Sequence, residues 1–135
     1  MRTAKTGFTL IELLFAILIF LLMTVILAPF VQMAKERAGR VACATNLRKI
    51  SLGLHAYAAD NNGAFPADPA MLYPNYVNDK KVLACPALKA GYKYSAGLTE
   101  SSPQENVIVE DLDGNHKRSG KNMLKVNGSV EWAGK

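Results

Sequence analysis

The sequence has few of the residues on which catalytic and metal sites usually depend. It contains two cysteines, which are not in C-x-x-C spacing, two histidines and one tryptophan in 135 residues. It has no glycine-rich phosphate loop, no histidine and glutamate metal pair, and no nucleophile beside an obvious base. His116 lies near Asp113 and Ser119, but three polar residues in one loop lack the rigid support that a catalytic triad needs. We therefore do not expect an enzyme.

Charge is almost absent from a long segment near the N-terminus. From Phe8 to Val31 the only charged residue is Glu12. As a helix this segment would be about 36 Å long, more than the roughly 30 Å of a bilayer hydrocarbon core, so it predicts a transmembrane helix. Because Arg2 and Lys5 precede it, the N-terminus is expected to stay cytoplasmic, with the chain after residue 31 on the periplasmic or extracellular side.

Two simpler interpretations of this segment are a secretory signal peptide and a plain membrane anchor. Signal peptides usually have an apolar core of about 7 to 15 residues and an A-x-A-like cleavage site, and this segment is longer and lacks that site. Neither interpretation explains Glu12. A carboxylate in a bilayer costs about 2.5 to 3.5 kcal/mol at the helix centre, and less near an end, so Glu12 should have a partner. Cleavage between Gly7 and Phe8 would supply one, because the freed α-amine of Phe8 is a cation.

The segment GFTLIELL, residues 7–14, follows a basic leader and precedes an apolar run. It resembles the prepilin N-terminus shared by type IV pilins and type II secretion pseudopilins. The resemblance implies a leader peptide of residues 1–7, removed after Gly7 by a prepilin peptidase that also methylates Phe8. It further implies that residues 8–31 form a filament core, in which Glu12 pairs with the amine of a neighbouring subunit. A subunit docked out of register would leave this charge unpaired, at a cost of several kcal/mol.

Pro29 lies where a proline is common in this family. It would remove one backbone hydrogen bond and clash with the carbonyl group of Val25. The resemblance implies a role in assembly through local flexibility before this proline. An ordinary kink in a membrane helix is the alternative.

Residues 32–62 are predicted to continue the helix in amphipathic form, leading into a globular domain. Gly63 suits the left-handed position that ends a helix, and Pro66 follows soon after. One face carries apolar residues at spacings of 4, 3, 4 and 3, namely Cys43, Leu47, Ile50, Leu54 and Tyr57. The other faces are expected to carry Arg40, Arg48, Lys49, Ser51 and His55.

Residues 63–135 are predicted to form a loop and a small antiparallel sheet. Residues 64–90 hold four of the six prolines and suggest a surface loop with one helical turn at Pro69–Leu72. The strand-like segments YKYSA, NVIVED, NMLKV and SVEWA follow, and Asn127-Gly128 predicts a type I′ hairpin between the last two. Three or four strands covering the helix would give an α+β, pilin-like fold.

The two cysteines favour a disulfide in a domain exported past the membrane. Cys43 lies on the apolar helix face and Cys85 lies in the short apolar segment VLACP. A bridge between them would contribute about 4 kcal/mol by loop-closure entropy. Two buried free thiols, or a metal site completed by a histidine, are the alternatives.

Two further blocks look like a pseudopilin-like group widespread in bacteria. The first is CATNLRKISLGLHAYAADNNGAFP, residues 43–66, and the second is residues 120–132, similar to a C-terminal ending G-x-N-V-L-F-x-D-G-x-V. Asn127 replaces the usual aspartate of that ending, and His116 stands one residue too far upstream of the turn.

Asp111, Asp113 and Asn115 place three oxygen ligands at alternate positions, as at the start of a calcium loop. The glutamate that closes an EF-hand is missing, and a solvated acidic loop is the alternative. The family resemblance supports calcium, because major pseudopilins of type II secretion bind it in their C-terminal loops.

The resemblance implies a structural subunit of a type II secretion-like pseudopilus in the bacterial inner membrane. Its implied partners are a prepilin peptidase, identical or homologous subunits, an inner-membrane assembly platform, and the lipid bilayer before assembly. A type IV pilus or competence minor pilin is one alternative, and a single-pass anchored binding domain is another.

The net charge of the chain bears on nucleic-acid binding. Loss of Arg2 and Lys5 would lower the formal net charge from +5 to +3. The remaining lysines are scattered, with few stacking aromatics beside them, so we do not expect nucleic-acid binding.

Overall fold

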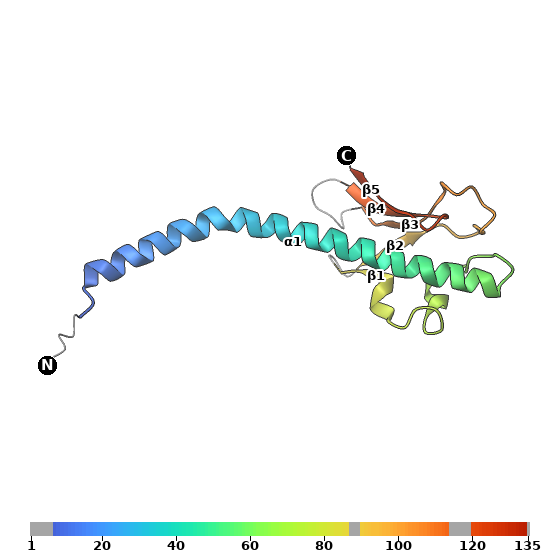
Figure 1. Cartoon of the computed structure of the whole chain (residues 1–135), viewed down its shortest axis with the longest axis horizontal. Coiled ribbons are helices and arrows are strands. Elements are labelled where there is room, and N and C mark those ends of the chain that lie inside the picture. Colours follow the sequence, from blue (N-terminus) through green and yellow to red (C-terminus); the bar gives the residue numbers. More distant parts are fainter. Residues whose placement is uncertain (1–6, 87–89, 114–119, 135) are drawn as a thin grey trace, which may run out of the picture. The chain divides into compact units, whose positions relative to one another are not determined.

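Helix α1 (Leu10–Asp60) is the longest element of the computed structural model, which describes residues 7–86, 90–113 and 120–134 (Figure 1). The chain divides into two compact units, one up to Lys35 and one from Glu36 onward. This division falls close to the predicted boundary between residues 31 and 32.

The first unit contains the apolar part of α1. An 18-residue window of this helix has a mean hydropathy of 3.0, none of it is buried, and the helix is long and apolar enough to cross a membrane. Pro29 lies inside the helix, which continues on both sides of it. A helix that is apolar all round and uncovered by its own chain needs lipid or other helices around it.

The second unit buries the predicted helix face. Cys43, Leu47, Ile50 and Leu54 are each at most 1% exposed, and Tyr57 packs partly buried against the same core. The period of 3.6 residues therefore predicted this face correctly. Ser51 was assigned to the solvent side, which is wrong, because it is 6% exposed and its hydroxyl lies against the turn at Gly128.

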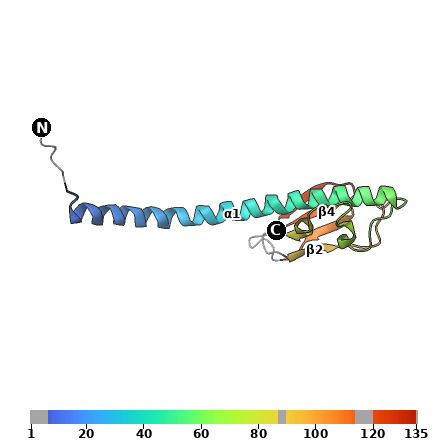
Figure 2. The same ribbon diagram turned by 90° about the horizontal axis from the view of Figure 1, so that it is seen from below.

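Five antiparallel strands form the sheet, and their order in space follows the sequence. Figures 1 and 2 show the sheet beside the second unit's part of α1, which confirms the α+β fold class. The sequence predicted three or four strands and missed the shortest, which has two residues. The strands are β1 (Ala84–Cys85), β2 (Ala90–Tyr94), β3 (Val107–Asp111), β4 (Gly120–Lys125) and β5 (Val130–Gly134).

The segment between α1 and the sheet closes the core from another side. It contains two short 3-10 helices, η1 (Pro69–Leu72) and η2 (Lys80–Leu83), of which the sequence predicted the first. Leu72, Val77 and Val82 of this segment join the core. A Cβ atom added at Gly53 of α1 would lie 2.8 Å from a methyl group of Val77. The absence of a side chain there lets the segment pack directly on the helix.

The hairpin between β4 and β5 differs from the predicted type I′ turn. A type I′ turn needs positive φ at both central residues. Gly128 has φ +81°, whereas Asn127 is not among the described residues with positive φ. The amide of Gly128 donates to the Lys125 carbonyl at 3.0 Å and that of Lys125 to the Ser129 carbonyl at 2.9 Å, which defines a three-residue loop. The loop starts at Val126 because that residue is 1% exposed in the core and its amide donates to the Asn106 carbonyl.

Glu110 on β3 gives the second unit a predicted acid sensitivity. Lys121 and Lys93 lie 2.5 and 2.8 Å from its carboxylate, and their hydrogen bonds lower the pKa of Glu110 below its ordinary value of 4.5. A carboxyl group with a lowered pKa stabilises the fold above its unfolded-state pKa, and this contribution is lost as the pH falls through the folded-state value. The parent chain should therefore lose more stability than Glu110→Gln when the pH is lowered from about 6 to about 3. Thermal unfolding of both full chains in detergent measures this difference. Equal losses in the two proteins would contradict this prediction.

Candidate processing and assembly site

Gly7 and Phe8 are both exposed, with Phe8 75% exposed. A Cβ atom built on Gly7 would meet nothing within 4 Å, and the residue does not have the positive φ that favours glycine. The fold of the chain therefore does not require glycine at this position. A requirement for glycine would have to come from an enzyme that recognises the bond between these two residues.

Glu12 lies in the first turn of α1, directly after Thr9 and two apolar residues. Its amide and that of Leu13 donate to the Thr9 carbonyl at 3.1 and 3.2 Å. The Thr9 hydroxyl donates to the Glu12 carboxylate at 3.5 Å, at the outer limit of a hydrogen bond. The spacing Thr9-x-x-Glu12 matches a helix capping box, a signal that the sequence analysis missed. The helix dipole also favours a carboxylate in this first turn.

The surroundings of Glu12 decide what this carboxylate can do. Exposed large apolar side chains occupy all sides of α1 from Leu10 to Val31. Across the described ranges, no ion pair involves Glu12, and its one side-chain contact is the long bond to Thr9. If lipid or other helices cover this surface, the carboxylate loses its water and must gain a cation or a proton. If the chain is cut after Gly7, the freed α-amine of Phe8 on an adjacent chain would be a candidate cation.

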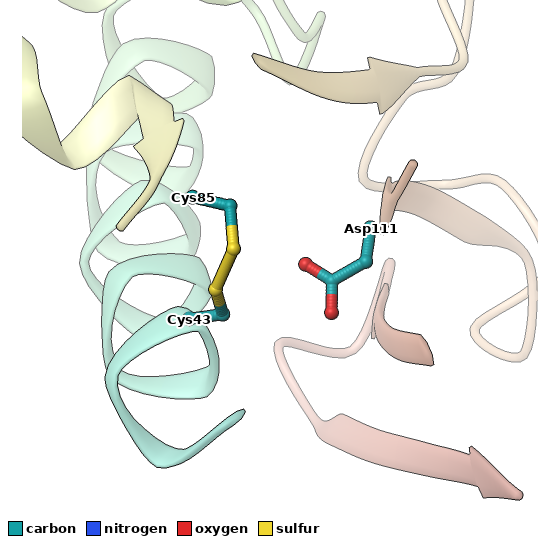
Figure 3. Close-up of side chains that lie close together, drawn as sticks. All are labelled: Cys43, Cys85 and Asp111. Carbon is teal, nitrogen blue, oxygen red and sulfur yellow. A yellow bond between two sulfur atoms is a disulfide. The ribbon is translucent and has the colours of Figure 1, made fainter. Parts of the chain in front are cut away.

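Cys43 and Cys85 form a disulfide, with an S–S distance of 2.04 Å and both side chains fully buried. The bridge joins α1 to β1. Figure 3 shows the carboxylate of Asp111 on β3 directed toward this bridge. The sulfur atoms and a carboxylate oxygen lie within 4.8 Å of one another. Because both sulfurs are bonded to each other, they offer no thiolate to a metal ion.

The structure buries the first residue of the predicted calcium loop. Asp111 is 2% exposed and accepts hydrogen bonds at 2.9 Å from the backbone amide and the side chain of Asn122. Asp113 is exposed, and Asn115 lies outside the described residues. Asp111 is therefore a buried partner of β4 rather than the surface ligand that a calcium loop requires. The cause is the alternation of β3, which points this side chain into the core.

Comparison with known families agrees with the geometry of the N-terminus. The model of the prokaryotic N-terminal methylation motif matches residues 2–28. The N-terminal segment therefore carries the motif of type IV pilin-like prepilins. This class implies processing by a prepilin peptidase and assembly with other pilin subunits, and a membrane-anchored pilin is consistent with the apolar helix. The match does not extend to the second unit, and no curated protein and no solved structure matches the chain.

Proposed function

We propose that this prepilin is a non-enzymatic structural subunit of a type II secretion-like pseudopilus. The observation that carries the proposal is the single carboxylate, that of Glu12, in the part of α1 up to Val31, which is apolar on all sides. Such a surface suits lipid before assembly and other helices after it. The likeness of residues 43–66 and 120–132 to the pseudopilin-like group supports secretion over a pilus. Retention of Glu12 supports a body subunit, because tip subunits of type II secretion usually lack this glutamate.

The proposed sequence of events follows from the charges and the apolar surface. The precursor inserts into the inner membrane with its basic leader in the cytoplasm and the second unit outside. The peptidase cuts after Gly7 and methylates Phe8. An assembly platform then moves the subunit from lipid into a filament. Glu12 selects the register, because only a correctly docked neighbour places its amine beside the carboxylate.

Deletion of the gene in its source organism tests the proposed system. We expect release of secreted proteins into the medium to stop, while surface pili and DNA uptake remain. The parent chain should restore secretion. Loss of pili or of DNA uptake with normal secretion would instead support the type IV pilus or competence role and contradict the proposal.

Replacement of Gly7 tests the processing step without disturbing the fold. Gly7→Leu adds a side chain in open space, so the second unit should fold and keep its disulfide. The peptidase has to accept the residue before the cut, and we expect the larger side chain to prevent cleavage. Intact-mass measurement of the membrane protein should then find residues 1–7 still attached. Normal cleavage of this variant would contradict the assignment of Gly7.

A further inference from the structure

The second unit carries opposite charges at the two ends of its part of α1. Arg37 and Arg40 outnumber Glu36 in its first two turns, and Asp60 is the last residue of the helix. At 1.5 Å per residue, Arg37 and Asp60 are about 35 Å apart along the axis. They therefore cannot pair within one copy of the chain.

The basic end is a formed groove. Its volume is about 400 Å³, and its lining is Arg37, Arg40, Val41, Ala44, Asn122 and Trp132. The guanidinium group of Arg40 lies 3.5 Å from the centroid of the Trp132 ring, a stacked geometry that leaves in-plane N–H donors for another partner. The amide of Asn122 donates to the Arg40 carbonyl at 3.3 Å.

Trp132 also packs against Gly120. This glycine has φ +136°, and any Cβ atom there would collide with the Trp132 ring. The ring therefore packs directly on the backbone of β4, and Arg40 stacks on a fixed surface. Val41, which is 65% exposed, adds an apolar wall that the chain itself leaves uncovered.

The acidic end has no lysine or arginine partner among the residues that the structure describes. The last turn of α1 has no basic residue, so the Asp60 carboxylate lies at the negative end of the helix dipole, which is unfavourable. Its side-chain contact is the Tyr76 hydroxyl, which donates to it at 2.9 Å. Glu100 lies at the same end of the helix, because its amide donates to the carbonyl of Gly63, just after α1, and its carboxylate is 3.0 Å from His55. Within the part of the chain that the structure describes, neither carboxylate forms an ion pair with lysine or arginine.

We infer that the groove at Arg37, Arg40 and Trp132 receives the acidic end, Asp60 and Glu100, of a second copy of the chain. This inference rests on the proposed function. Arginine and carboxylate groups form strong, bidentate hydrogen bonds, and the stacked Arg40 is already oriented for one. The contact joins the basic end of one copy to the acidic end of the next, so it is a head-to-tail contact. Such a contact repeats from copy to copy without closing a dimer. It would fix the axial order of the outer units, while Glu12 fixes that of the apolar helices.

Charge reversal in the full chain, expressed with its peptidase, tests this contact. Arg37 and Asp60 are suitable because both are exposed. Arg37→Glu and Asp60→Arg should each lower the sheared, sedimentable polymer at least about tenfold, and the double variant should restore it to within about twofold of the parent. Arg48→Glu is the matched control, since it makes the same charge change on an exposed residue of the same helix, and it should polymerise like the parent. Parent-like single variants, a double variant no better than the singles, or an equal loss in the control would overturn the inference.

Two further measurements separate this result from misfolding and from failure of the proposed function. Protease resistance and the disulfide on a non-reducing gel report folding. Should a reversed charge unfold the unit, Arg37→Gln and Asp60→Asn test the contact in another way, because each should lower the polymer and the double variant should lose no more than one single variant. Glu12→Gln, measured in the same experiment, shows whether the proposed function or only the head-to-tail contact is wrong. If that variant also polymerises like the parent, the proposed function is wrong, whereas if it alone fails, only the head-to-tail contact is wrong.

Discussion

Glu12→Gln is expected to abolish polymer formation while leaving cleavage after Gly7 intact. Glutamine keeps the shape of the side chain and can occupy the same position in a capping box, so α1 should still begin at Leu10. What it lacks is the charge. Removing one partner of a buried ion pair costs about 3 to 5 kcal/mol, because the other charge remains unpaired, which corresponds to more than a hundredfold in association.

Thr9→Ala is the matched control for this experiment. It removes the hydroxyl that contacts Glu12 at the position expected for a helix cap, yet it leaves the carboxylate in place. A cap residue is worth about 0.5 to 2 kcal/mol, so polymer formation should be reduced far less than in Glu12→Gln. The opposite ranking, with Glu12→Gln close to the parent and Thr9→Ala defective, would show that Glu12 acts as a helix cap and not in assembly.

Removal of the disulfide is expected to have the largest effect on the second unit. Cys43 and Cys85 are 42 residues apart in sequence, and closing a loop of this length stabilises a fold by about 4 kcal/mol. For a domain of about 100 residues, this corresponds to a fall in Tm of about 15 to 30 °C. Thermal unfolding of Cys43→Ala/Cys85→Ala in detergent, followed by circular dichroism, measures the effect.

The parent chain unfolded in the presence of a thiol reductant is the control for this loss. It keeps both cysteine side chains, so it separates the effect of the bond from the cavity that alanine leaves. We expect the reduced parent to lose most of the stability that the double variant loses. A reduced parent that unfolds at the same temperature as the oxidised one would show that the bridge adds no stability.

The sequence predicted the parts of the fold that depend on local periodicity. The buried face from Cys43 to Tyr57 follows from a helical period, and the strands β2 to β5 follow from alternation and β-branched residues. The features it missed depend on residues far apart in the chain. Strand β1 exists through its pairing with Ala90 and Gly91, and the β4–β5 turn shifts because Asn106 binds Val126.

The candidate functional residues likewise include some that the sequence predicted and some that it did not. Gly7, Phe8 and Glu12 are recognisable because they belong to one short, contiguous motif. The groove that Arg40 forms with Trp132 was not predicted, since 92 positions separate the two residues and nothing local links them. Asp111 was misassigned for a related reason: the sequence shows an acidic turn, but the partner that draws this carboxylate inward, Asn122, lies on the next strand.

The central claim is that the chain becomes a subunit by cleavage before Phe8, which creates the amine that pairs with Glu12. Intact-mass and N-terminal peptide analysis of the protein, taken from a sheared filament fraction of the native organism, tests it most directly. We expect a chain that lacks residues 1–7 and carries one methyl group on the amine of Phe8. A chain that keeps residues 1–7, or one cut at the far end of the apolar segment, would contradict it.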